Sequence, residues 1–245
     1  MNLQQALPGW RVYTFRRISS TEDFAKDLVR QQPTNKQPLL VVADEQTNGY
    51  GRYGRQFYSP QQTGIYLSIA MPKIDCPPGL LTISLAVTVV HVLEHYFPTK
   101  QLQLKWVNDI YLAQKKVAGL LVEQVAGMLI CGIGINLSTT DFPLNLREKA
   151  GALTTQPIIQ HSAIIKSLIN EIQNDLDRYA DGEMLDEYRE RLMILHQLVT
   201  IKVAHRLITG HVRDITSTGA LIVETLQGER VTINSGEVVK VNFNV

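Results

Sequence analysis

The sequence has few cysteines and almost no excess charge. Its 245 residues include two cysteines, Cys76 and Cys131, which form no CxxC or metal-ligand spacing. This excludes a disulfide scaffold as the main source of stability and fits a reducing compartment. The net charge is +1, from 24 Lys and Arg against 23 Asp and Glu. General electrostatic attraction to DNA or to an anionic membrane is therefore not expected, and any anion site must be local.

A signal peptide and a membrane span are also missing from the pattern. The first ten residues, MNLQQALPGW, contain no basic region followed by an apolar run. The longest apolar stretch, residues 80–93, contains Thr and Ser and is shorter than the ~20 residues that a spanning helix needs. We therefore expect this stretch to form a buried core helix and the protein to be cytoplasmic.

Hydrophobic periodicity divides the chain near residue 196. Before it, the patterns predict helices over residues 20–30, 80–97, 158–179 and 183–195, with short strands between them. Thr155 as a cap and Pro157 near the first helical position fit the third helix. Residues 1–195 are thus expected to form an α+β domain with a mixed or antiparallel sheet. Residues 196–245 contain short strands with intervening turns and predict a small β-barrel.

A long loop, residues 44–64, connects the strands predicted at 39–43 and 65–71. It contains the run GYGRYGR at residues 49–55. Glycines let the backbone approach a ligand, and Arg52 and Arg55 offer planar groups suited to phosphate or carboxylate. The loop therefore indicates an anion cradle, although a flexible solvated turn would have the same composition. The spacing matches neither the Walker P-loop nor the GxGxxG fingerprint.

Two further motifs follow. The run KWVND (105–109) with KVAG (116–119) predicts a hairpin that could present Lys105 and Lys116 to one pocket, and the alternative is an ordinary surface hairpin. The run GIGINL (132–137) predicts an apolar strand that ends in a polar amide, which by itself is typical of a core strand followed by a turn.

The motifs together, in this order, resemble those of the biotin protein ligase family. They are Ser20-Thr21, GYGRYGR, KWVND with KVAG, and GIGINL, and the resemblance covers essentially the whole chain. It implies a biotin/lipoate ligase-like catalytic domain followed by a small C-terminal SH3-like β-barrel. Repressor members of the family carry an N-terminal helix-turn-helix domain. Because the first strand is expected near residue 12, the chain resembles the ligase-only form.

The resemblance implies a two-step acyl transfer. Biotin and ATP would form biotinyl-5′-AMP, and a lysine of a biotin carboxyl carrier domain, such as that of acetyl-CoA carboxylase, would then take the biotinyl group. Mg²⁺ would enter with ATP, near Asn136, with no metal held by the protein alone. DNA and membranes are not expected as partners, and a homodimer is left open.

The resemblance also assigns roles to individual residues. The implied catalytic residues are Lys116, Arg52 and Lys105. The implied biotin-binding residues are Ser20, Thr21, Gln46, Gly49, Trp106, Lys116 and Gly119. The implied nucleotide-binding residues are Arg52, Arg55, Phe57, Lys105, Asn108 and Asn136.

Three positions depart from the family pattern. Val107 stands where proline is frequent, Phe57 where many members have tryptophan, and Tyr50 where arginine is frequent. Tyr50 removes a cation from the loop, so the intermediate would escape faster unless the tyrosine ring packs over it. A lipoate or octanoate ligase and a non-catalytic biotin- or adenylate-binding protein are the alternative functions. Ser20-Thr21, Gln46 and the KWVND block favour biotin.

Overall fold

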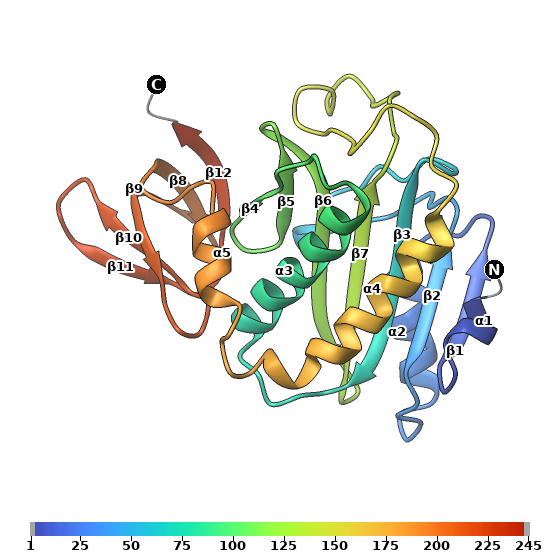
Figure 1. Ribbon diagram of the computed structural model, residues 1–245. Helices are drawn as coiled ribbons and strands as arrows, with labels where there is room; N and C mark the ends of the chain where they lie inside the picture. The colour runs from blue at the N-terminus through green and yellow to red at the C-terminus, as the bar shows by residue number, and fades with distance from the viewer. Residues whose placement is uncertain (1–2, 243–245) are drawn as a thin grey trace.

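The computed structural model describes residues 3–242 and contains two β-sheets (Figure 1). The larger sheet has the strand order β1-β2-β3-β7-β6-β5-β4, in which β1 and β2 are parallel and the other neighbours are antiparallel. The predicted mixed sheet is thereby confirmed. Its strands are β1 (Arg11–Phe15), β2 (Leu39–Ala43), β3 (Gly64–Pro72), β4 (Gln103–Lys105), β5 (Asp109–Leu112), β6 (Lys115–Val125) and β7 (Met128–Asn136).

Helices cover both faces of this sheet (Figure 1). They are α1 (Leu3–Ala6), α2 (Thr21–Gln31), α3 (Pro78–Tyr96), α4 (His161–Asp175) and α5 (Leu185–Arg191), with 3₁₀ turns η1 (Arg52–Gly54) and η2 (Leu176–Arg178). In β2, Leu40 and Val42 join the main core with α3 and α4, whereas Leu39 and Val41 pack with α2. This alternation is the period-two pattern of a strand that is buried on both faces.

Helix α3 is long and apolar enough to pass a length and composition test for a membrane span. Two thirds of its tested window, 67%, is buried inside the protein. Thirteen of its residues, from Leu80 to Leu93, are buried, and α4 packs against it. The helix is therefore the core helix that the sequence predicts.

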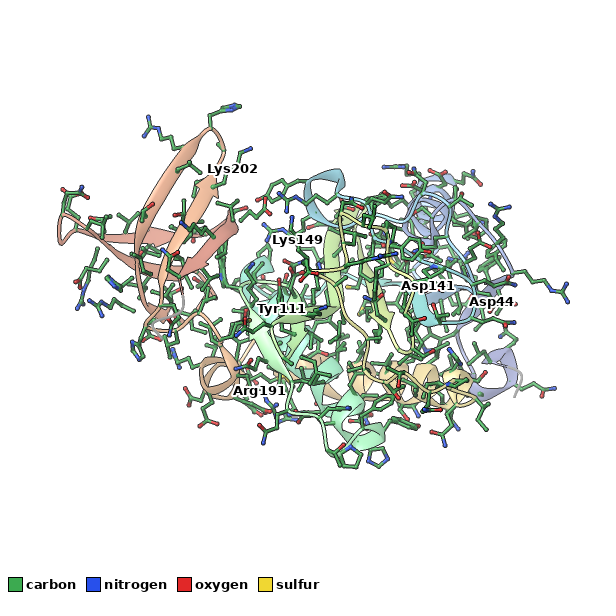
Figure 2. The ribbon with its side chains drawn as sticks, turned by 90° about the horizontal axis from the view of Figure 1, so that it is seen from above. Asp44, Tyr111, Asp141, Lys149, Arg191 and Lys202 are labelled. Atoms are coloured by element: carbon green, nitrogen blue, oxygen red, sulfur yellow. The ribbon has the colours of Figure 1, made fainter. Side chains whose placement is uncertain are left out.

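The C-terminal part forms a five-stranded antiparallel sheet in the order β11-β10-β9-β8-β12. Its strands are β8 (Leu198–Val203), β9 (Arg206–Ile215), β10 (Leu221–Thr225), β11 (Arg230–Ile233) and β12 (Glu237–Asn242). Figure 2 shows this sheet, labelled at Lys202, as a smaller lobe beside the main body. The buried indole of Trp106 donates a hydrogen bond to the Gly219 carbonyl at 2.9 Å, and Arg189 of α5 donates to Asp214 at 2.7 Å. These contacts join the two lobes.

Two predicted helices are shorter than expected. Helix α4 begins at His161 rather than residue 158, so Thr155 and Pro157 lie outside it. Ile159 is 96% exposed, so of the two isoleucines before Gln160 only Ile158 packs against the core. Helix α5 ends at Arg191 because Leu192 adopts an extended conformation and the Met193 amide bonds to the Leu104 carbonyl.

Candidate functional site

The cavity that most of the predicted biotin-binding residues line, called the main cavity below, lies on the α2 face of the large sheet, beside the first turn of α2. Its empty volume is about 450 Å³. Gly119 on β6 and Gly132 and Gly134 on β7 line it, and the space over these glycines is occupied by the side chains of Lys116, Glu22 and Phe57. Glycines in the sheet therefore let these three side chains lie directly against the strands at the cavity wall. The other lining residues are Ser20, Thr21, Glu22, Gln46, Tyr50, Gly51, Phe57, Leu67, Ser68, Asn108, Lys116, Leu120, Leu121 and Ile133.

One end of the cavity is a set of neutral hydrogen-bonding groups. Ser20 is the N-cap of α2, and its Oγ accepts from the Asp23 amide at 3.2 Å. The Thr21 amide and hydroxyl both donate to Gln46 Oε1, at 2.8 and 3.0 Å. Thr21 Oγ1 also lies 2.9 Å from Ser68 Oγ on β3. This end holds several donors and acceptors in fixed positions, which suits a neutral polar ring.

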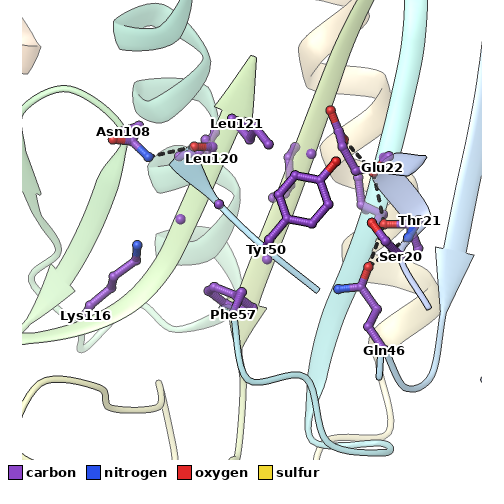
Figure 3. Close-up of a pocket in the computed structure, with 17 residues that line it drawn as sticks. Ser20, Thr21, Glu22, Gln46, Tyr50, Phe57, Asn108, Lys116, Leu120 and Leu121 are labelled. Carbon is purple, nitrogen blue, oxygen red and sulfur yellow. Dashed lines mark hydrogen bonds between the residues drawn. The ribbon is translucent and has the colours of Figure 1, made fainter. Parts of the chain in front are cut away.

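The opposite end carries a cation. Figure 3 shows Lys116 and Asn108 across the cavity from Ser20, Thr21 and Gln46, with Tyr50 and Phe57 between them. Lys116 Nζ lies 2.7 Å from Asp109 Oδ1, and Asn108 Nδ2 donates to the Leu120 carbonyl at 2.7 Å. A Cβ placed on Gly119 would lie 2.8 Å from Lys116 Nζ. Glycine at position 119 thus leaves the space that the ammonium group occupies.

Phe57 lies against the strand β7. A Cβ on Gly134 would come within 2.6 Å of the Phe57 ring, so a side chain at position 134 would displace this ring. The ring is edge-on to Tyr66, with centroids 6.4 Å apart. The sequence gives Phe57 as a nucleotide-binding candidate, and the structure places it on the wall of the cavity.

The loop arginines reach toward the C-terminal lobe. Arg52 Nη2 donates to Ser235 Oγ at 3.3 Å, and Arg55 forms an ion pair with Glu237. Lys105 is half-buried, and burial, together with the nearby cations Lys116 and Arg55, lowers its pKa against the opposing effect of Asp109. The predicted phosphate-binding cations therefore share one region, although Arg52, Arg55 and Lys105 are not among the residues lining the main cavity.

Three other predicted residues are not among those that line the cavity. Trp106 is 4% exposed and its indole bonds to the C-terminal lobe, as described above. Gly49 packs under Gln46 and Ser59, where a Cβ would come within 2.6 Å of Gln46 Nε2. Asn136 is buried and donates to the Gly151 carbonyl at 3.0 Å. Their roles in ligand binding remain predictions.

Sequence reasoning missed a buried charge cluster at the cavity. Glu22 is 3% exposed, accepts from Ser68 Oγ at 2.9 Å, and lies 3.9 Å from Lys26 Nζ. Burial raises the pKa of Glu22 to about 7, against the opposing effects of Ser68 and Lys26. The signal was present: Glu22 precedes the buried residues Ala25 and Val29 by three and seven positions, which places it on the inner stripe of α2.

Lys26 connects this cluster to two other elements. Its Nζ donates to Tyr50 of the long loop at 3.0 Å and pairs with Glu123 of β6. Burial opposes the charge, but the hydrogen bonds to Glu123 and Tyr50 outweigh it and raise the pKa of Lys26. The ammonium group is therefore charged at neutral pH.

The fold and the cavity together define a ligand-binding α+β domain followed by a small β domain. Residues 14–139 match the model of the biotin/lipoate A/B protein ligase family, and residues 195–241 match that of the biotin protein ligase C-terminal domain. The first match covers more than half of the chain. The chain therefore belongs to the biotin/lipoate A/B protein ligase family.

Individual relatives are similar over most of the chain. The biotin–[acetyl-CoA-carboxylase] ligase of Mycobacterium tuberculosis is 25% identical over 94% of this chain and 90% of its own length. The bifunctional ligase/repressor BirA of Escherichia coli is 27% identical over 89% of this chain and 70% of its own length. The structure of the Aquifex aeolicus biotin protein ligase in complex with biotin and ATP is 25% identical and superposes with a TM-score of 0.80, covering 93% of this chain and 97% of that one.

Proposed function

We propose that this chain is an ATP-dependent biotin protein ligase that forms biotinyl-5′-AMP and transfers biotin to a carrier lysine. The observation that carries the proposal is one cavity with two chemically different ends. Ser20, Thr21 and Gln46 supply neutral hydrogen-bonding groups at one end, and Lys116 supplies a cation at the other. Biotin has a neutral ureido ring and a carboxylate at the end of its aliphatic chain, so the two ends of the cavity match the two ends of the molecule.

In the first step, a carboxylate oxygen of biotin attacks the α-phosphorus of ATP and the bond to pyrophosphate breaks. Two anions approach each other in this step, so a fixed cation between them lowers the barrier. Lys116 is suited to this role because Asp109 orients its ammonium group at 2.7 Å. Arg52, Arg55 and Lys105 lie in the same region and would bind the triphosphate.

In the second step, the amine of a carrier lysine attacks the acyl carbon of biotinyl-5′-AMP. An amide bond forms, the bond to AMP breaks, and the amine loses a proton. The protein's contribution is to hold the acyl group in place, which the Ser20–Gln46 end achieves by fixing the ring. The proposed acceptor is the biotin carboxyl carrier domain of a carboxylase. The proposed location is the cytoplasm, and DNA is not a proposed partner.

Mg²⁺ is proposed to accompany ATP. Within residues 3–242, no three His, Cys, Asp or Glu side chains gather as a metal site, and the Oδ1 atom of Asn136 is buried without a hydrogen-bond partner. Mg²⁺ binds oxygen ligands, so the unpaired amide oxygen of Asn136 is suited to hold it. Bound Mg²⁺ would neutralise phosphate charge.

The decisive experiment is incubation of the protein with ATP, a carrier domain, and radiolabelled biotin, lipoate or octanoate in parallel. We expect label on the carrier only from biotin, and release of pyrophosphate only when biotin is present. Label from lipoate would support the lipoate ligase alternative. Tight binding of biotin without pyrophosphate release or transfer would show a non-catalytic binding protein.

A further inference from the structure

The hydroxyl of Tyr50 joins the long loop to helix α2. It donates to Asp23 Oδ1 at 2.5 Å and accepts from Lys26 Nζ at 3.0 Å. Lys26 Nζ also lies 5.3 Å from the centre of the Tyr50 ring. Two oppositely charged groups, one helical turn apart, therefore hold one neutral hydroxyl.

The ammonium group of Lys26 and the backbone of Asp23 are held in place without any ligand. The Asp23 amide donates to Ser20 Oγ in the first turn of α2. Lys26 is 7% exposed and is held by Glu123 of β6 and by Glu22 of its own helix. Hydrogen bonds to charged groups are stronger than neutral ones, and these need little further ordering of side chains. The contact thus differs from a loose surface pair.

Tyr50 remains a hydrogen-bond donor at physiological pH. Burial and the hydrogen bond to Asp23 raise its pKa to about 12, against the opposing effect of Lys26. The remaining charges of the cluster, Glu22 and Glu123, contact Lys26 rather than Tyr50. The contact of the Tyr50 hydroxyl with Asp23 and Lys26, called the anchor below, therefore does not depend on ionisation of the tyrosine.

Tyr50 lies at the base of a small hairpin. The Phe57 amide bonds to the Gly49 carbonyl at 2.8 Å, Tyr50 pairs with Gln56, and the Gly51 amide bonds to the Arg55 carbonyl at 2.8 Å. The turn between these pairs carries Arg52, and its residues Tyr53 to Arg55 are exposed. Contacts at the base therefore determine where the arginines at the tip can be.

We propose that Tyr50 is a positioning residue: bonded to Asp23 and Lys26, it holds the hairpin 49–57 against α2 and retains the ligand in the cavity. The inference rests on the proposed function for the identity of that ligand. The hydroxyl of Tyr50 and its ring have different roles. The ring lines the cavity, whereas the hydroxyl makes the anchor.

The test compares Tyr50→Phe, which keeps the ring and removes the hydroxyl, with wild type. We expect release of preformed biotinyl-5′-AMP to be about 10-fold faster, which corresponds to about 1.4 kcal/mol. In the ligand-free protein, trypsin cleavage after Arg52 and Arg55, identified by mass spectrometry, should be several-fold faster. Tyr13→Phe is the matched control, because Tyr13 on β1 packs against Phe24 of α2 and lies outside the cavity.

A double-mutant cycle separates anchoring from a general loss of stability. Once Tyr50→Phe has removed the hydroxyl, adding Asp23→Asn should increase neither cleavage nor release further. Full additivity of the two substitutions overturns the proposal, as does wild-type release by Tyr50→Phe. The cleavage measurement uses no ligand. It therefore shows whether the Tyr50 hydroxyl holds the hairpin against α2 even if the chain fails to bind biotin.

Discussion

Lys116 Nζ lies 2.7 Å from Asp109 Oδ1 at the opposite end of the cavity from Thr21 and Gln46. The carboxylate fixes the ammonium group, and both side chains are partly exposed to solvent. Asp109 opens β5 and Lys116 is on β6, so the β5–β6 hairpin itself creates the pair.

Replacing Lys116 by alanine should slow adenylation strongly. If the ammonium group neutralises the attacking carboxylate and the α-phosphate, its loss costs most in the transition state. We expect Lys116→Ala to reduce pyrophosphate release by ~10²- to 10³-fold, while biotin binding weakens less. Lys115→Ala is the control, because Lys115 is exposed and bonds to the Arg147 carbonyl. Near wild-type adenylation by Lys116→Ala would remove the assigned role.

Gly134→Ala tests whether the position of Phe57 shapes the cavity. The new Cβ would lie 2.6 Å from the Phe57 ring, so the ring must move. We expect a loss of ~1–3 kcal/mol in the free energy of unfolding and weaker biotin binding by isothermal titration. Adding Phe57→Leu should recover part of the stability because the smaller side chain leaves space. An alanine variant with unchanged affinity and stability would show that the ring adapts freely.

Trp106→Phe tests whether Trp106 acts mainly as a link between the lobes. The substitution removes the donor to the Gly219 carbonyl and leaves that acceptor unpaired, at a cost of ~1–3 kcal/mol. We expect lower stability in urea unfolding with little change in biotin affinity. Trp10→Phe, at the other buried tryptophan, controls for the smaller ring. A loss of biotin affinity without a loss of stability would instead support the predicted role of Trp106 beside the biotin chain.

Glu22 should make stability depend on pH. Its pKa is about 7 in the folded protein and 4.5 when unfolded, so the folded state binds the proton more tightly. The corresponding stabilisation is complete below pH 4.5 and is lost as the pH rises through 7, by up to about 3 kcal/mol.

Unfolding by urea at pH 5 and pH 8 would measure this effect. Glu22→Gln cannot ionise, so we expect its free energy of unfolding to fall less than that of wild type between the two values. Glu229→Gln, at an exposed turn position, should behave as wild type. A decrease in Glu22→Gln equal to that in wild type would show that Glu22 does not titrate in this range.

Local patterns were sufficient for much of the fold and for part of the site. The capping sequence at Ser20 and the apolar run of β7 identified two of the elements that carry the cavity. Ser20, Thr21, Gln46 and Lys116, which the family resemblance implied as biotin-binding residues, all line it. The predicted start of α4 was wrong. Pro157 is compatible with the first turn of a helix, but Ile159 is exposed and α4 begins only at His161.

The charge cluster could not be found in the same way. Lys26 and Glu123 are 97 positions apart, and only the packing of α2 against β6 brings them together. Tyr50 could be identified as a departure from the family pattern, but nothing near it in the sequence indicates Asp23 as its partner. Pairs of this kind depend on the tertiary arrangement, which periodicity does not specify.

In its ion pair with Glu237, Arg55 of the larger lobe already has an anionic partner in the smaller lobe. Arg55 is on the long loop and Glu237 opens β12, so a phosphate bound by Arg55, as the proposed function has it, would displace a carboxylate of the C-terminal sheet. Departure of that phosphate would return the arginine to Glu237. Nucleotide binding and this contact with the smaller lobe would then be thermodynamically linked, and each would weaken the other by the same factor.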